Sequence, residues 1–260
     1  MNAPLFDTVR HLRNGSFLAD CPAIDWEQSL DRLHRRNVAV LERLCGDKAL
    51  FRSLILGARE DPYLWSKCEE DVVEDKIVLW DDMTKGIRIR LRMAIAPQQR
   101  LAHCHRFSFT NLVLAGQYIH WMYRPLEAFD ELTNLDDVET VGQRVDRAGD
   151  AFTIHHETLH STPFSGVGTV SLVLRGNPVK ARAPVMFKEA RGRAEQLEKM
   201  RSDGAQSARG NTEEPRQARV GDFFWRVGEE SESKERRAER QMRTERVDYW
   251  IKELGRLGIL

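Results

Sequence analysis

The first part of the chain places apolar residues three and four positions apart, which is the spacing of one face of an α-helix. Residues with this spacing are Trp26, Leu30, Leu33, Val40, Leu41 and Leu44. Asp25 followed by Gln28 has the form of a capping box and predicts that the helix begins there, while Gly46 predicts its end. A second, shorter helix is expected to end at Gly57. We therefore expect residues 1–74 to form an N-terminal helical region.

The pattern then changes to strict alternation, which is typical of a half-buried β-strand. Between Ile87 and Ile95, aliphatic residues alternate with three arginines. Further strand-like stretches cover residues 105–113, 118–123, 151–155 and 169–174. Short strands separated by glycine turns, with few helices among them, predict an antiparallel sandwich or barrel. The predicted fold is therefore mainly β, with the barrel spanning residues 75–185.

The last part of the chain is rich in charged residues. We expect residues 186–230 to form a flexible charged linker, interrupted by an apolar anchor at Phe223 to Trp225. Residues 231–260 are expected to contain a C-terminal amphipathic helix. Its apolar stripe consists of Val247, Trp250, Ile251, Leu254 and Leu257. This stripe is expected to dock on the core or on a second subunit, which is compatible with a homodimer but does not require one.

Composition narrows the classes of protein to which the chain can belong. Among its 260 residues, Lys+Arg total 40 and Asp+Glu total 40, so the chain lacks the net basic charge that nucleic-acid binding needs. No apolar run approaches the roughly 20 residues of a membrane-spanning helix. The N-terminal residues 1–19 lack the apolar stretch of a secretory signal, and the four cysteines are scattered, as in a reducing compartment. We therefore expect a cytoplasmic protein with neither a nucleic-acid nor a membrane partner.

Histidines are concentrated in the predicted barrel, where six of the eight lie between residues 103 and 160. His103 and His105 are separated by one residue, so on a strand their rings point to the same side and can bind one metal ion together. Cys104 between them then points the other way, into the core. A third ligand has to come from another strand; His160 is the prediction, with His155 as the alternative.

Three neutral imidazoles bind a divalent ion without neutralising its charge. The ion keeps about two positive charges in a poorly screened interior, where thiolate or carboxylate groups bind its open coordination positions well. Open positions distinguish a catalytic site from a structural one. Iron(II) held on one face can bind a substrate and O₂ together, whereas zinc or another divalent metal would act as a Lewis acid. The residues alone do not separate iron from zinc.

These features together resemble the cupin superfamily. The resemblance rests on His103-x-His105, Gly116, Gly149-Asp150 and His160 before the stretch 169–174. It covers residues 75–184 and implies a double-stranded β-helix barrel, here with N-terminal helices and a C-terminal helical extension. Cupins usually supply a glutamate four or five residues after the second histidine, where this chain has Phe109 and Thr110. The remaining three-histidine set is similar to that of the thiol (cysteine) dioxygenase branch, which implies iron(II).

The late strand of the predicted barrel departs from this branch. Ser171 matches, but Val173 stands where the branch has a histidine, and Arg175 stands where it has an active-site tyrosine. Thr110 occupies the position of the cysteine that forms a thioether cross-link in mammalian-type members. The resemblance therefore implies neither this cross-link nor cysteine itself as substrate, and we expect a distant relative with its own substrate.

Four further residues are candidates for contact with a substrate. Arg175 is predicted either to bind a substrate carboxylate in a bidentate pair or to lie at the surface at the end of its strand. Arg92 shares a strand face with two other arginines. We expect the aliphatic residues of that strand to fill the barrel and the arginines to face solvent or another subunit, with one arginine reaching inward as the alternative. Tyr118 and His120 are predicted either to line the cavity or to pack in the core.

The sequence thus favours a mononuclear non-haem iron(II) oxygenase that acts on a small amino-acid-like, thiol or carboxylate substrate together with O₂. Two alternatives stay open. One is a non-oxidative metal-dependent enzyme (a lyase, isomerase or hydrolase) on the same histidines. The other is a non-catalytic barrel that only binds a ligand.

Overall fold

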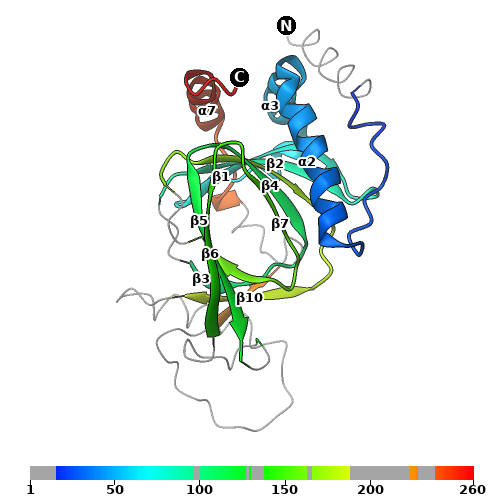
Figure 1. The fold of residues 1–260 in the computed structure, drawn as a ribbon. Coiled ribbons are helices and arrows are strands. Elements are labelled where there is room, and N and C mark those ends of the chain that lie inside the picture. The colour runs from blue at the N-terminus through cyan, green and yellow to red at the C-terminus, as the bar shows by residue number, and fades with distance from the viewer. Residues whose placement is uncertain are drawn as a thin grey trace, which may run out of the picture.

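The structure is a computed structural model, and it describes residues 16–96, 100–126, 129, 138–162, 166–187, 223–227 and 238–260. Two antiparallel β-sheets face each other, and helices lie outside one of them (Figure 1). The mainly β barrel expected from the sequence is thus confirmed, together with the N-terminal helices and a C-terminal helix.

The helices are α2 (Leu30–Gly46), α3 (Lys48–Glu60), α4 (Pro62–Trp65) and α7 (Thr244–Arg256). Gly46 ends α2 as expected, but the prediction that this helix begins at Asp25 is wrong. The Asp25 carboxylate accepts a hydrogen bond from the Glu27 backbone N–H at 3.0 Å, and the Gln28 side chain donates to the Asp25 carbonyl at 2.8 Å. These bonds close a turn, and α2 begins only after it, at Leu30.

The strands of the first sheet are β1 (Glu74–Asp82), β2 (Ile87–Ala94), β9 (Val170–Arg175), β4 (Phe109–Ala115) and β7 (Ala151–Ile154), in this spatial order. Those of the second sheet are β11 (Phe223–Val227), β10 (Arg182–Phe187), β3 (Arg100–His103), β8 (Leu159–Ser161), β5 (Gln117–Pro125) and β6 (Val138–Arg147).

Five of these strands were not expected from the sequence, namely β1, β6, β8, β10 and β11. The predicted apolar anchor at Phe223 to Trp225 is β11, which pairs antiparallel with β10. Residues 186–187 of the predicted linker end β10, and its remaining residues outside β11 are not among the described ones.

The two faces of the first sheet differ in character. The outer face is aliphatic and joins the main hydrophobic core through Ile87, Ile89, Leu91, Met93, Leu172 and Leu174. The inner face carries, in register, Arg88 opposite Arg175, Arg90 opposite Val173, and Arg92 opposite Ser171. The expectation that the aliphatic residues fill the barrel and the arginines face solvent is therefore wrong. Helices cover the aliphatic face from outside, and the arginines point into the barrel.

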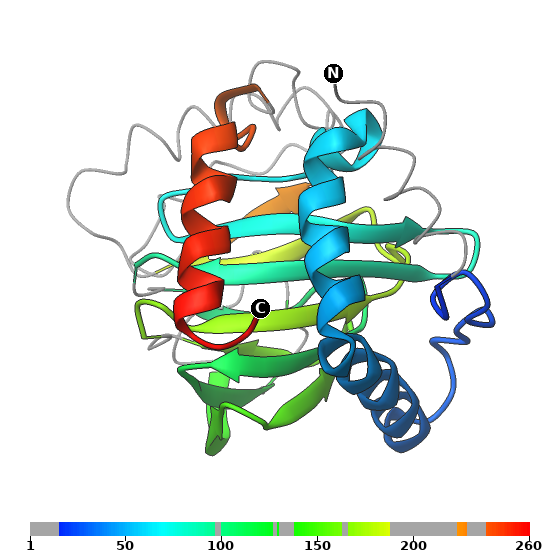
Figure 2. The same ribbon diagram turned by 90° about the horizontal axis from the view of Figure 1, so that it is seen from above.

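Helices α3 and α7 both lie across the outer face of the first sheet (Figure 2). Helix α7 buries Val247, Trp250 and Leu254 in the same core as the N-terminal helices. The Trp250 indole donates to the Asp75 carboxylate at 2.6 Å, which fixes the helix to β1. From the sequence, the chain's own core and a second subunit were the two expected docking sites for the C-terminal stripe. In the structure the stripe packs on the chain's own core.

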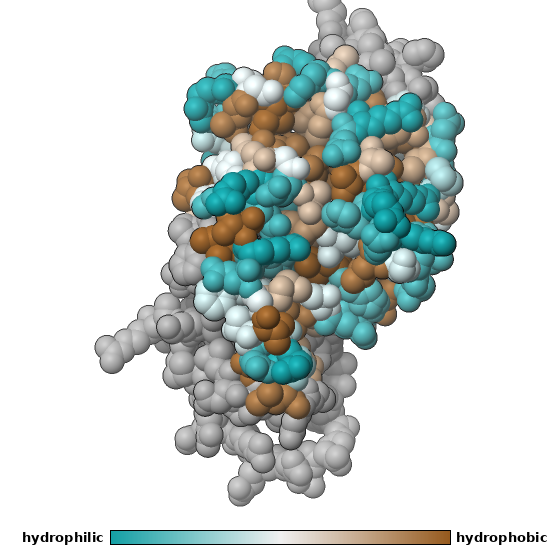
Figure 3. Space-filling view, viewed as in Figure 1, coloured by the Kyte–Doolittle hydropathy of each residue, from teal (hydrophilic) through white to brown (hydrophobic). Residues whose placement is uncertain are grey.

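The face seen in Figure 3 has hydrophilic residues interspersed with small hydrophobic groups over its described part. Among the described residues, no helix is both long enough and apolar enough to cross a bilayer.

One ion pair beside the first sheet gives a prediction for acid stability. Burial alone would raise the pKa of Glu69, but Lys76 at 2.8 Å, together with Arg90, outweighs it and lowers this pKa to about 2. The folded pKa thus lies below the unfolded value of 4.5. Stability from this pair is present above pH 4.5 and is lost as the pH falls from about 4.5 toward 2.

We therefore expect Glu69→Gln to lower the free energy of unfolding at pH 7 by about 3 kcal/mol. The variant should lose less stability than the parent on acidification through that window. Urea unfolding at several pH values measures this. If the free energy of unfolding fell equally in both proteins as the pH is lowered, the pKa of Glu69 would not be lowered by folding.

Candidate metal centre

Three histidines from distant parts of the sequence converge between the sheets. His103, His105 and His160 each offer a ring nitrogen, and these nitrogens all lie within 4.8 Å of one another. The ring centroids are 4.9, 4.6 and 5.0 Å apart for the pairs 103–105, 103–160 and 105–160. Nε2 of His105 and Nε2 of His160 are separated by 2.7 Å. Nitrogens bound to one ion at about 2.1 Å lie about 3 Å apart, so this donor set fits a shared divalent cation.

The backbone explains why the three rings meet. His103 is the last residue of β3 and pairs directly with His160 on β8. His105 lies beyond the end of the strand, where its N–H donates to the His156 carbonyl at 3.3 Å. The expectation that both histidines sit on one continuous strand is therefore wrong, although their rings still converge. Cys104 between them is buried, as expected.

His120 on β5 is buried and connects the cluster to a carboxylate. Its Nε2 lies 2.5 Å from His160 Nδ1, and its Nδ1 lies 3.3 Å from Asp146 Oδ2 on β6. An ionised carboxylate only accepts, so His120 carries its proton on Nδ1, and its Nε2 accepts from His160 Nδ1–H. This arrangement leaves Nε2 of His160 with a free electron pair directed toward His105, as metal binding requires.

Burial favours the neutral form of His160 and of His120. It places the pKa of His160 well below its ordinary value, and the neighbouring His103, His105, His120 and Arg92 lower it further. Burial also lowers the pKa of His120, against the opposite effect of Asp146. Neutral rings are the form that ligates metal, so the cluster is ready to bind an ion at neutral pH.

The Asp146 contact gives a prediction for metal affinity. In Asp146→Asn, the new amide can donate a hydrogen bond to His120 Nδ1, so the proton of His120 moves to its Nε2. The N–H at His120 Nε2 then points at the N–H at His160 Nδ1, and the two repel each other. We expect a 10- to 100-fold loss of metal affinity, about the effect of losing such a supporting contact elsewhere. Competition with a chromophoric chelator measures it.

The control for this prediction is Arg144→Gln. Arg144 also donates to Asp146 Oδ2, at 3.2 Å, but its side chain is 47% exposed, so solvent replaces it easily. Its loss should change metal affinity less than threefold. Equal losses in both variants would indicate a general effect of charge rather than of tautomer.

Aromatic rings surround the cluster on the inner face of the first sheet. The Phe109 ring lies 4.8 Å from His105 and 6.3 Å from His160, centroid to centroid. The Phe152 ring lies 4.8 Å from His120. These rings, together with Tyr118 and Val173, belong to a second, smaller hydrophobic cluster. They make the surroundings of the metal site apolar, which strengthens electrostatic interactions there.

Tyr118 and Arg92 point inward but already have partners. The Tyr118 hydroxyl lies 2.9 Å from Ser171 Oγ, and burial raises the pKa of this tyrosine, so it stays protonated. Arg92 Nε donates to Glu74 at 3.0 Å. Of the two alternatives for the β2 arginines, the inward orientation is the one found.

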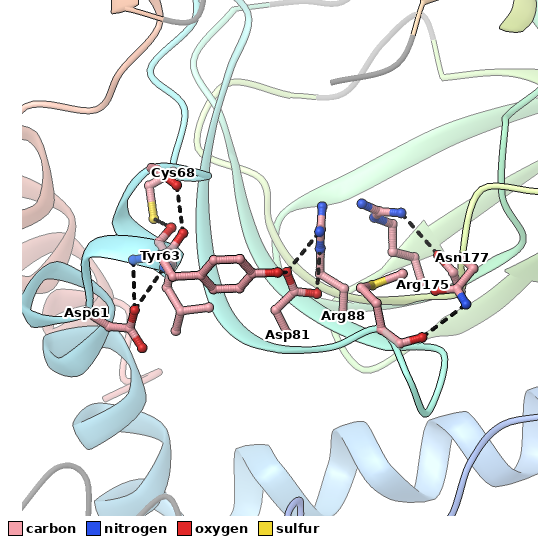
Figure 4. Close-up of polar contacts among 11 residues, drawn as sticks. Asp61, Tyr63, Cys68, Asp81, Arg88, Arg175 and Asn177 are labelled. Carbon is pink, nitrogen blue, oxygen red and sulfur yellow. Dashed lines mark hydrogen bonds and ion pairs between the residues drawn. The ribbon is translucent and has the colours of Figure 1, made fainter. Parts of the chain in front are cut away.

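Arg175 is buried at the end of β9, so it does not lie at the surface. Figure 4 shows its guanidinium and that of Arg88 pointing to the same side of the sheet. Arg175 donates to the Gly176 carbonyl at 3.1 Å, and its guanidinium carbon lies 4.2 Å from the Phe107 ring centroid. The Phe107 ring is in turn 6.0 Å from that of His105. One aromatic ring thus separates Arg175 from the metal ligands.

Arg88 forms a bidentate ion pair with Asp81 (Figure 4). Nε and Nη2 donate to the two carboxylate oxygens at 2.9 and 2.8 Å, and the side chains are 5% and 0% exposed. The Tyr63 hydroxyl donates to the same carboxylate at 2.9 Å. This ion pair lies beside Arg175, because Arg88 and Arg175 are paired across β2 and β9.

His155, the alternative third ligand, lies outside the three-histidine cluster. Together with His156 and Glu157 it forms a second group of ligand-type atoms within 4.8 Å, in the partly exposed turn between β7 and β8. His156 is held by Ser108, whose Oγ lies 3.1 Å from its Nδ1. The geometry therefore joins His160, and not His155, to His103 and His105.

Asn111, which the sequence analysis did not single out as a site residue, lies on the same inner face. Its side chain is fully buried, and neither its amide nitrogen nor its oxygen has a hydrogen-bond partner among the described residues. Such a group costs about 1–3 kcal/mol of stability per unmet hydrogen bond. The only sequence signal for it is a polar residue at an inward position of a strand, and Asp146 on β6 likewise has no stronger signal.

Comparison with known proteins adds distant structural likenesses. No protein-family model matches the chain, and no curated protein matches it in sequence. KdgF from Halomonas sp. is 15% identical with a TM-score of 0.30, over 42% of this chain and 87% of its own. An RmlC-like cupin from Shewanella frigidimarina is 14% identical with a TM-score of 0.31, over 42% and 83%. The DMSP lyase DddQ from Ruegeria pomeroyi is 14% identical with a TM-score of 0.31, over 43% and 50%. Scores this low carry no argument about activity.

Proposed function

We propose that this protein is a mononuclear non-haem iron(II) oxygenase of the cupin type, whose metal is held by His103, His105 and His160. The substrate is a small amino-acid-like, thiol or carboxylate compound, and O₂ is the co-substrate. The observation that carries the proposal is the convergence of three histidine ring nitrogens within 4.8 Å. No carboxylate joins this group in the described part of the chain, so the ligand set leaves the cation's charge in place to attract an anionic substrate.

Iron(II), when bound, supplies the one-electron chemistry that O₂ requires. The protein's own residues hold the site for it. His120 and Asp146 fix the proton of His160 on Nδ1, which orients that ring. Phe109 and Phe152 exclude water around the ligands. Arg175 is a candidate for orienting a substrate anion, because its guanidinium packs on the Phe107 ring, which in turn lies 6.0 Å from the His105 ring.

Metal analysis of protein purified without oxygen tests the proposal. We expect about one iron per chain, and oxygen uptake when candidate amino acids, thiols or carboxylates are added. Tightly bound zinc without oxygen uptake would instead indicate a non-oxidative metalloenzyme. Full activity in a His103→Ala variant would rule out metal catalysis at this site.

A further inference from the structure

The side-chain amide of Asn111 has no hydrogen-bond partner among the described residues and lies inside the barrel that contains the metal centre. Asn111 is on β4, the strand between β9 and β7, where it lies opposite Val173 and Phe152. Alternation along β4 puts its side chain on the inner face with Phe109. The outer face is defined by Thr110, which accepts a hydrogen bond from Asn37 of α2 at 3.0 Å. Asn111 is therefore directed into the barrel.

Two aromatic rings next to Asn111 on the inner face also contact the histidine cluster. Phe109, two residues before Asn111, contacts His105 with ring centroids 4.8 Å apart. Phe152, paired directly with Asn111, contacts His120 at 4.8 Å. The neighbours across the sheet and along the strand are apolar, so they offer the amide no hydrogen bond. No described residue supplies a partner for this amide, so a ligand bound in the barrel can supply it.

The amide selects the chemistry of that group. Its Nδ2 donates two hydrogen bonds and its Oδ1 accepts, so it complements a ligand that presents an acceptor and a donor side by side. Arg90 lies on the same inner face in the row of Asn111, and its charge favours a negative acceptor, whereas Arg92 in the next row is paired with Glu74. A carboxylate with an amine or hydroxyl on the adjacent carbon meets both conditions.

We infer that Asn111 is the substrate-recognition residue of this site and that the substrate is an α-amino or α-hydroxy acid. Nδ2 donates to the carboxylate, and Oδ1 accepts from the neighbouring N–H or O–H. This inference rests on the proposed metal-dependent function only for which carbon of the substrate reacts. The hydrogen bonds between Asn111 and the acid do not require a metal.

Calorimetry on the full chain, with Co(II) added and without metal, tests the contact. The probes are L-lactate and L-alanine, compared with propanoate, which lacks the donor, and methyl lactate, which lacks the carboxylate. We expect at least one of the two acids to bind about tenfold or more tightly than both reference compounds. In Asn111→Leu this preference should disappear, while Co(II) affinity stays unchanged and the ligand-free protein melts at a higher temperature.

Asn37→Leu is the matched control, since it makes the same substitution at a buried asparagine behind β4. It should retain the preference. Equal binding of propanoate and lactate, failure of both acids to bind, or unchanged affinities in Asn111→Leu would each overturn the inference. A protein that binds no divalent metal yet still binds the acids through Asn111 would refute the proposed function and leave this contact standing.

Discussion

Replacing His160 with alanine is expected to abolish metal binding. His160 offers Nε2 to the cluster, 2.7 Å from the corresponding atom of His105, and no other described group lies in position to replace it. Because loss of a supporting contact alone costs 10- to 100-fold in affinity, loss of a ligand should cost more than about 100-fold. Metal content after dialysis and oxygen uptake should both fall below a tenth of the parent's values.

His155→Ala is the control for this variant, because sequence reasoning offered His155 as the other third ligand. It lies in the partly exposed turn after β7, apart from the cluster. We expect metal content and activity within twofold of the parent. Retention of metal in His160→Ala together with its loss in His155→Ala would reverse the assignment. Circular dichroism of both variants checks that the barrel is intact.

Replacing Asp81 with asparagine is expected to destabilise the protein by about 3–5 kcal/mol. The Arg88 guanidinium is 5% exposed and loses its bidentate carboxylate, so its charge remains in a poorly hydrated interior. Little solvent reaches the pair to compensate. Denaturant unfolding at neutral pH measures the loss as a shift of the transition midpoint.

The variant Tyr63→Phe is the comparison for Asp81→Asn, because it removes one hydrogen bond to Asp81 and leaves the carboxylate's charge in place. It removes only the hydroxyl that donates to Asp81, from a side chain that is largely exposed. Its cost should be about 1 kcal/mol or less. A loss in Asp81→Asn that is no larger than the loss in Tyr63→Phe would mean that Arg88 finds another partner or reaches water.

The sequence predicted the period of β2 but not which of its faces is inside. Alternating aliphatic and arginine residues give the same pattern in either orientation. What decides is the apolar surface of the helices, because Leu33, Phe51 and Leu254 need a partner and the aliphatic face of the sheet provides it. The arginines are then left to face inward, where Asp81 and Glu74 of β1 pair with Arg88 and Arg92.

The three histidines of the candidate metal site could be predicted because histidine is a rare residue type. Metal binding requires only that their three rings come together, whatever the exact ends of the strands that carry them. The contact between His120 and Asp146 was not, because it depends on β6. This strand is exposed along most of its length and lacks an alternating apolar pattern, so nothing in its sequence distinguishes it from an irregular acidic stretch. Asn111 was not chosen as a site residue because an amide is not an expected metal ligand and one inward amide does not alter a strand's periodicity.

The aliphatic outer face of the first sheet bears on how this protein can be divided. Residues 75–185 contain most of both sheets and all three histidine ligands, yet an excised fragment with these limits would expose to water the surface that α2, α3 and α7 now cover. Such a fragment would self-associate rather than fold autonomously. The flanking helices are therefore an obligate part of the folding unit, and any minimal version of this protein has to keep both ends of the chain.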